Sequence, residues 1–435
     1  MIEAPSASIG LVGAPFVGAL LSLACRSKPE RLKFCVIMTA VISGGTVVGL
    51  AGSLTGPTEG ILFSFLLPLT AVVSLMGQPV HPMHRSSSIM TLLFLGLGLG
   101  VLTQGGLAGK ILTAAIAAFI AVLLHRHHTQ LWPISRWGIA TYGLGAGAIL
   151  AAAFADLPLS AIASLLAGAV LLPLVPLHGG YLAALTRLPG NLPSFLSVLL
   201  PVIGVHGVDA AIGAVPEGLA GVVAILAVGS ALYSAIKALA QSRVQLRLAY
   251  GSLSFMSILW WFAASARVTG PSTDAFVGAV ALVTSGLLVS WQVVRTRFGD
   301  DVDPHSISGL AASMPRYAVL LSLLSLAAIG LPPFGVFAGF IGLLLAPTVS
   351  FSIALLCILL AWLSASWYIL DLVQHLLFGT HRPDLPHTDL NRAEFASLLL
   401  VVLALLVLGI LPARLVGSGV PTPTTSETES FAWKK

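Results

Sequence analysis

Five side chains in this 435-residue chain could exchange protons within or beside apolar sequence: His178, His206, Lys237, Asp371 and His375. Lysine, histidine and carboxylate groups inside a membrane are costly, so they often mark an ion pathway. Lys237 is the one lysine that falls within a long apolar run. It could relay a proton, or its amine could reach the water at the nearby end of that run.

The remaining four candidates lie near the ends of apolar runs. His178 and His206 flank one predicted span, and histidine is the side chain best suited to carry protons near neutral pH. A histidine in contact with water is an ordinary alternative at both positions. Asp371 and His375 are four residues apart and share a helix face. They could form a proton-carrying pair, but a cap that orients the neighbouring loop is the favoured interpretation.

Other kinds of chemistry find little support in the sequence. The run His125-Arg126-His127-His128 could suggest metal ligands, yet its place beside a span end favours a charged anchor. The three cysteines match no metal-ligand or disulfide spacing. There is no glycine-rich phosphate loop, Walker motif, iron–sulfur cysteine cluster or catalytic triad. We therefore predict no catalytic residue, no metal site and no cofactor in this chain.

The composition excludes a soluble enzyme. Apolar residues make up 57% of the chain and Asp, Glu, Lys and Arg only 9%, against about 25% in soluble domains. The mean hydropathy is +0.99. The net charge of +5 comes from cations scattered between apolar runs, without the basic patch that nucleic acid requires. The lipid bilayer is the expected partner, and nucleic acid is not.

The apolar runs predict an all-α polytopic membrane protein with about 14 transmembrane helices. Residues 1–417 form one transmembrane domain in this interpretation, and 418–435 form a polar tail. The run 316–346 is too long for one straight span and contains Gly330-Leu331-Pro332-Pro333, so it predicts a broken helix. The predicted segments are 8–25, 34–54, 61–77, 88–106, 110–124, 137–155, 158–177, 192–212, 217–240, 248–264, 274–294, 316–346, 350–378 and 395–413.

The cations between these segments predict the orientation. With the N-terminus outside, the inside loops hold about three times as many Lys and Arg residues as the outside ones. This bias is typical of cytoplasmic loops. Both termini are then extracytoplasmic. Arg243 and Arg247 fall in a short inside loop, where they could contact a subunit or lipid phosphate, or merely hold the topology.

Three stretches are more specific than generic membrane helix. The first is Pro176-Leu177-His178-Gly179, with Pro189 eleven residues after the histidine. The second contains Leu248-Ala249-Tyr250-Gly251-Ser252. The third is Gly309-Leu310-Ala311-Ala312-Ser313-Met314-Pro315, followed by Gly330-Leu331-Pro332-Pro333. Together they resemble the antiporter-like membrane subunits of respiratory complex I, membrane-bound hydrogenases and multisubunit cation/proton antiporters. The resemblance covers a core of about 137–395. Its motif positions are Pro176, Pro189, Ala249, Tyr250, Met314, Pro315, Pro332 and Pro333.

The resemblance implies a membrane subunit of an NADH-quinone oxidoreductase-type complex that couples redox chemistry to proton translocation. Other membrane subunits would be its partners, any redox chemistry would belong to them, and its location would be a bacterial-type inner membrane. The alternatives are a membrane subunit of a hydrogenase or of an inorganic-carbon transporter, and a non-conducting structural subunit. The family's proton-carrying lysines and acids fall on residues without charge, and its buried glutamate has no counterpart. The lysine and acid positions fall on Leu171, Val202 and Phe340 and near Gln245 and Thr284, and a family histidine falls near Val280.

Overall fold

The computed structural model describes residues 5–24, 29–51, 61–79, 85–127, 133–299, 307–346, 349, 351–378 and 388–410. The regular structure in these ranges is helical. The helices are α1 (Pro5–Ala24), α2 (Pro29–Ala51), α3 (Ile61–Gly77), α4 (Arg85–Thr103), α5 (Gly106–Arg126), α6 (Pro133–Phe154), α7 (Leu159–Leu171), α8 (Gly179–Arg187), α9 (Leu192–Ile212), α10 (Glu217–Leu239), α11 (Val244–Ala266), α12 (Pro271–Phe298), α13 (Leu310–Ser313), α14 (Pro315–Ile329), α15 (Gly335–Leu344), α16 (Ile353–Leu377) and α17 (Arg392–Ile410).

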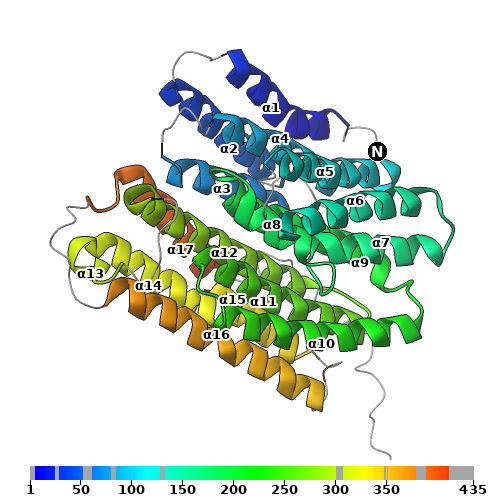
Figure 1. Cartoon of the computed structure of the whole chain (residues 1–435). Helices are drawn as coiled ribbons and strands as arrows, with labels where there is room; N and C mark the ends of the chain where they lie inside the picture. Colours follow the sequence, from blue (N-terminus) through cyan, green and yellow to red (C-terminus); the bar gives the residue numbers. More distant parts are fainter. Residues whose placement is uncertain are drawn as a thin grey trace, which may run out of the picture.

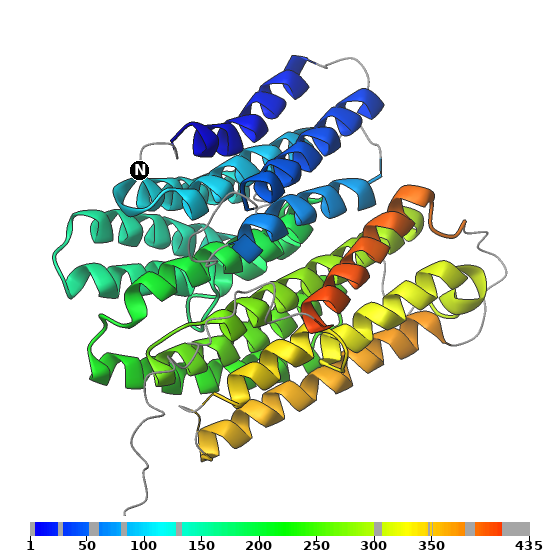
Figure 2. The same ribbon diagram turned by 180° about the vertical axis from the view of Figure 1, so that it is seen from behind.

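The helices lie side by side in one elongated bundle (Figures 1 and 2). The N-terminal helices α1 and α2 form one side, and α10 and α16 form the opposite side. Helices α9 and α12 lie between the two. The α11 and α12 segments are almost entirely buried, whereas less than two-fifths of the residues in the apolar segments of α2, α10 and α16 are buried. An exposed apolar rim around a packed centre is the arrangement expected of a protein surrounded by lipid.

Each of the fourteen predicted segments contains a helix of the structure. Ten helices in the described ranges are long and apolar enough to cross a bilayer alone, and α1, α3, α7, α14 and α15 include shorter apolar stretches. The predicted break within 316–346 is confirmed: α14 ends at Ile329 and α15 begins at Gly335. The predicted polar tail 418–435 lies outside the described residues.

The prediction of one continuous segment over 158–177 is wrong. Helix α7 ends at Leu171, and a separate helix, α8, follows at Gly179. Pro173 and Pro176 lack the backbone N–H groups that a continuing helix would need, and each ring crowds the preceding turn. The chain therefore contains two interrupted helices. We name residues 172–178 the first break and residues 330–334 the second break.

Two glycines allow other helices to pack closely against these regions. A Cβ atom on Gly204 of α9 would lie 2.6 Å from the Cβ atom of Leu172, at the first break. A Cβ atom on Gly339 of α15 would lie 2.6 Å from the Cα atom of Phe276. No larger side chain fits at either place without displacing the neighbour. Small residues at helix contacts thus fix the positions of both interrupted helices.

Charged side chains tie helix ends together at the two ends of the bundle. Lys33 donates to the carbonyl of Met76 at 3.3 Å, and Arg85 donates to that of Leu23 at 3.1 Å. These residues all fall on the predicted cytoplasmic side. On the other predicted side, Lys110 donates to the carbonyl of Ala152 at 2.7 Å. Basic side chains placed against the last carbonyls of a helix satisfy groups that lack intrahelical partners.

Candidate functional site

Both breaks use the same device to satisfy a freed backbone carbonyl. The Nε1 atom of Trp260 in α11 donates to the carbonyl of Leu172 at 2.9 Å. The Nε1 atom of Trp362 in α16 donates to the carbonyl of Ile329 at 3.0 Å. At the first break the backbone N–H of Val175 also donates to the Ser230 hydroxyl at 3.2 Å. Polar backbone inside a membrane protein needs such partners, since lipid offers none.

Four titratable side chains gather beside the first break. His178, at the start of α8, lies 5.9 Å from Tyr233 and 6.3 Å from Tyr250 between ring centroids. The two tyrosine rings are 6.4 Å apart between centroids and meet edge to face. The Lys237 Nζ atom lies 5.7 Å from the centroid of the Tyr233 ring, as in a cation–π contact. We name His178, Tyr233, Lys237 and Tyr250 the break cluster.

The break cluster contains His178 and Lys237, which the sequence predicted as proton-path candidates, and Tyr233 and Tyr250, which it did not. His178 and Lys237 come together because α8 and α10 both pack against α11. Tyr250 was a motif position only, and Tyr233 was missed. The sequence feature that could have identified Tyr233 is its position four residues before Lys237, because side chains four apart on a helix are neighbours. Next to it on α10, the Ser234 hydroxyl is buried without a hydrogen-bond partner in the described structure, and so is Nδ1 of His178.

Beyond the break cluster, the buried polar groups are mainly hydroxyls. Tyr181 and Ser252 share a hydrogen bond of 2.7 Å, and so do Ser230 and Ser257. A small cavity of about 20 Å³ is lined by Ser252, Thr284 and Tyr368, among others. That volume suffices for about one water molecule. Hydroxyl groups can pass hydrogen bonds along, but they do not hold a charge near neutral pH.

The second break is lined by aromatic rings. The Phe340 side chain is fully buried and packs against Trp362, with the Phe276 ring centroid 6.1 Å away. Phe255 lies 6.3 Å beyond Phe276. These rings take up the space where the resemblance places an ionisable side chain in relatives. An arrangement of this kind packs helices tightly, but it offers no ionisable side chain that could take up a proton.

Asp371 and His375 form a separate group with Arg247. The Nη1 atom of Arg247 lies 2.6 Å from Oδ2 of Asp371, and Nδ1 of His375 lies 3.2 Å from Oδ1 of the same carboxylate. Arg247 also donates twice to the carbonyl of Gln241, at 2.8 and 3.0 Å. The ion pair thus links α16 to the turn between α10 and α11. The sequence left the partner of Arg247 open, and its described contacts are within this chain.

A second ion pair was not predicted. Glu394 of α17 is buried and binds Arg297 of α12, with Nη2 to Oε2 at 2.7 Å and Nη1 to Oε1 at 3.3 Å. Five residues earlier, the Asp389 carboxylate accepts the backbone N–H groups of Arg316 and Tyr317 at 2.9 and 3.3 Å. This carboxylate satisfies the free N–H groups at the start of α14.

His206 is not part of the break cluster. It lies on α9 and lines a pocket at the other predicted end of the bundle, together with Lys110 of α5. The prediction had placed Lys110 only as an outside cation. The sequence feature that could have pointed to a pocket at Lys110 is the glycine-rich segment from Gly105 to Gly109 just before it.

The motif positions lie mainly at the ends of the interrupted helices. Pro176 is in the first break, and Pro332 and Pro333 are in the second. In the described ranges, no group of three or more His, Cys, Asp or Glu residues is arranged to hold a metal. His125 and His127 are exposed at the end of α5, and His128 lies outside the described residues. The remaining positions are Pro189 after α8, Ala249 and Tyr250 on α11, and Met314 and Pro315 at the start of α14.

Solved structures of respiratory membrane complexes contain the same fold. A chain of respiratory complex I from Thermus thermophilus with bound NADH aligns with a TM-score of 0.75 at 23% identity, covering 94% of this chain and 96% of that one. A chain of the membrane-bound sulfane sulfur reductase, an archaeal respiratory membrane complex, aligns with a TM-score of 0.79 at 16% identity, covering 94% and 96%.

Sequence relatives point to the same family. NADH-quinone oxidoreductase subunit 13 of Thermus thermophilus is 35% identical over 262 residues, which are 57% of this chain and 53% of that protein. Subunit M of the F(420)H(2) dehydrogenase of Methanosarcina mazei is 27% identical over 205 residues, 46% and 40% of the two chains. The chain spans about half the length of the curated relatives it matches. Residues 144–367, more than half of the chain, match the family described as NADH:quinone oxidoreductase/Mrp antiporter, TM, and the chain therefore belongs to this family of multi-pass membrane proteins.

Proposed function

We propose that this protein is an antiporter-like membrane subunit of a complex-I-type NADH-quinone oxidoreductase or a related respiratory assembly. The observation that carries the proposal is the pair of interrupted helices within the residues that match the family. The relatives bear the names of subunits of such complexes. Redox chemistry would then belong to partner subunits, since the motifs for a redox cofactor are missing from the sequence.

We further propose that this subunit does not conduct protons by the route of its family. The positions that the resemblance gives to lysines and acids hold Leu171, Val202 and Phe340, whose side chains are at most 3% exposed. At a fourth, the Thr284 hydroxyl donates to the carbonyl of Val280 in its own helix at 2.7 Å. A charge at membrane depth costs at least about 2.5–3.5 kcal/mol. A conducting subunit retains such charges because its path needs them.

A second candidate is a subunit of a hydrogenase-type complex. The sequence Pro332-Pro333-Phe334-Gly335 at the second break favours it, because this form resembles the hydrogenase-associated branch of the family. Both candidates share the scaffold and differ in the soluble module that would be attached. Identification of the attached subunits therefore separates them.

Affinity purification from gently solubilised membranes tests the assembly. The tagged chain is expected to bring down other membrane subunits together with a redox module. The isolated chain is expected to oxidise neither NADH, hydrogen nor quinol. A chain that purifies alone from intact membranes, or that shows redox activity by itself, would contradict the proposal.

The proposed orientation places both termini outside the cytoplasm. Reporter fusions after Arg31, Arg136 and Arg243 are expected to report a cytoplasmic location. Fusions near Asp209 and at the C-terminus are expected to report the opposite side. Two consecutive loops on one side of the membrane would contradict the proposed topology.

A further inference from the structure

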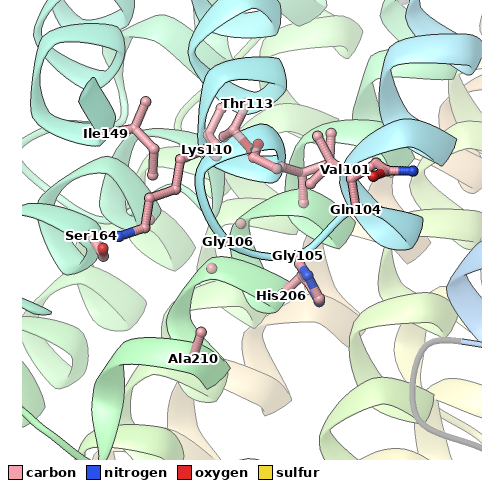
Figure 3. Close-up of a pocket in the computed structure, with 16 residues that line it drawn as sticks. Val101, Gln104, Gly105, Gly106, Lys110, Thr113, Ile149, Ser164, His206 and Ala210 are labelled. Atoms are coloured by element: carbon pink, nitrogen blue, oxygen red, sulfur yellow. The ribbon is translucent and has the colours of Figure 1, made fainter. Parts of the chain in front are cut away.

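A pocket of about 340 Å³ lies at the end of the bundle where α4 ends and α5 begins (Figure 3). Its walls come from α5, α6, α7 and α9. Six of its sixteen lining residues are glycines, so the backbone itself forms much of the wall. The volume is at the lower end of the range for sites that bind small molecules. Neither the sequence analysis nor the proposed function assigns it a role.

The charge of the lining is positive. Lys110 and His206 are its titratable residues, and no carboxylate is among the lining residues. The Lys110 amine is held at the wall by the carbonyl of Ala152 at 2.7 Å and the Ser160 hydroxyl at 3.3 Å. These two contacts leave one of its three N–H groups for a ligand. Figure 3 shows the lysine side chain crossing the pocket toward Ser164, with His206 on the opposite wall.

Two acids that lie near these groups in the chain, Asp156 and Asp209, are exposed and do not line the pocket. Asp209 lies one helical turn after His206 on α9, is exposed, and accepts a hydrogen bond from the Thr269 hydroxyl. Its partner comes from the segment after α11, which does not line the pocket. A negative ligand between Lys110 and His206 would therefore meet no buried carboxylate.

The start of α5 adds further donors. Gly105 precedes the helix without a side-chain cap, and Gly106 and Gly109 line the pocket within the first turn. The N–H groups of a first turn have no intrahelical acceptor, and the helix dipole favours an anion there. Gly106 and Gly109 line the pocket together with Lys110, so the start of α5 and the lysine lie at the same cavity.

Apart from Gln104, Thr113 and Ser164, the remaining side chains of the lining are apolar, and exposed apolar residues of α5 lie beside Lys110. Val101, Leu171 and Ile203 line the pocket with buried side chains. Leu107 and Ile111, which flank Lys110 on α5, are 50% and 48% exposed. A molecule with an anionic head and apolar chains could place its head beside Lys110 and its chains along α5. Basic pockets between transmembrane helices bind anionic lipid headgroups on the cytoplasmic side of membranes, and the same kind of contact is available here at the opposite end of the bundle.

We propose that this pocket binds the phosphate group of an anionic phospholipid, with Lys110 as the charged contact and the His206 ring as a second hydrogen-bonding group. The headgroup occupies the glycine-lined space, and the acyl chains lie against the exposed apolar residues of α5. The site is independent of proton conduction and goes beyond the proposed function.

Titration of the purified full chain with short-chain lipids tests the site. The probes are dioctanoyl phosphatidylglycerol, dioctanoyl phosphatidylcholine and inorganic phosphate, with bound lipid counted by native mass spectrometry. The wild-type chain is expected to prefer phosphatidylglycerol. Lys110→Gln removes the charge but keeps a hydrogen-bond donor, and it should weaken phosphatidylglycerol binding about tenfold or more while leaving phosphatidylcholine binding unchanged. Lys237→Gln, which removes a lysine elsewhere, is the matched control and should leave both unchanged.

A second variant keeps every charge and fills the pocket. A Cβ atom on Gly207 would meet no atom within 4 Å, so Gly207→Leu is expected to fold and to exclude the headgroup. Gly221→Leu on α10 has the same freedom outside the pocket and serves as its control. Equal binding of the two lipids by the wild type, or undiminished phosphatidylglycerol binding by both pocket variants, would overturn the proposal. If inorganic phosphate bound as tightly as phosphatidylglycerol, the proposal that the bound phosphate group belongs to a lipid would be wrong.

Discussion

The first and second breaks share a backbone solution and differ in everything that surrounds it. In each, a tryptophan indole donates to the carbonyl at the end of the first half-helix. The first break faces His178, two tyrosines and Lys237, whereas the second faces Phe340, Phe276 and Trp362. The interruption of a membrane helix is therefore a property of the scaffold. Whether an interrupted helix can hold charge or water is decided separately, by the side chains that the neighbouring helices present.

The largest expected effect comes from introducing a charge at each region. Phe340→Lys would bury an amine among aromatic rings and remove a fully packed side chain, so it should lower the stability by more than about 3 kcal/mol. Leu171→Lys should lower the stability less than Phe340→Lys does, because Leu171 lines the pocket together with the polar side chains of Thr113 and Ser164. Repulsion from the nearby Lys110 reduces this difference but should not cancel it. Thermal unfolding of the two variants in the same detergent measures the difference.

Phe340→Leu serves as the control for this pair, because it changes the packing without adding charge. Should Leu171→Lys destabilise the protein as much as Phe340→Lys, the contrast between a dry region and one that accommodates polar groups would fail.

A smaller effect is expected from the shared tryptophan device. Trp260→Phe and Trp362→Phe each remove an indole N–H and leave a carbonyl without its donor, which costs about 1–3 kcal/mol. Both variants should lower the unfolding temperature to a similar degree, since the carbonyl must be satisfied at either break. Trp367→Phe, at an exposed position on α16, is the control. A neutral result at one break would show that its carbonyl has another partner.

The smallest effect, on proton translocation, is expected at the break cluster, although its polar side chains suggest a proton path more strongly than those of the second break. His178→Ala and Lys237→Ala, each in the intact assembly, should leave the protons translocated per turnover nearly unchanged, although assembly can decline. The reason is the proposed loss of the family's route, since the resemblance assigns the positions that would continue the path to apolar Leu171, Val202 and Phe340. Proton uptake into vesicles, normalised to electron transfer and compared with an uncoupler control, provides the measurement. Loss of pumping with normal assembly in either variant would establish a rewired path through the break cluster.

Local sequence patterns predicted most of the fold. Apolar runs of about 20 residues give membrane helices wherever they occur in the chain, and Gly330-Leu331-Pro332-Pro333 interrupts a helix through its own backbone chemistry. The first break was missed because the apolar run of α7 continues past Leu171 through Leu172 and Leu174. Composition alone does not show at which residue the helical hydrogen bonds stop. The small helix α8 was missed for a different reason: it has only nine residues and begins with two glycines, so it is too short to form an apolar run.

The sequence by itself determined the membrane environment and the approximate positions of most spans, because both depend on residues close together in the chain. The tertiary structure alone decided which distant residues meet. His178 and Lys237 are 59 positions apart and share a cluster because α8 and α10 both contact α11. Arg247 finds Asp371 across 124 positions, Arg297 finds Glu394 across 97, and Lys110 faces His206 across a pocket. Such partnerships depend on how whole helices pack, where glycines let them approach closely, and no local period in the sequence records that packing.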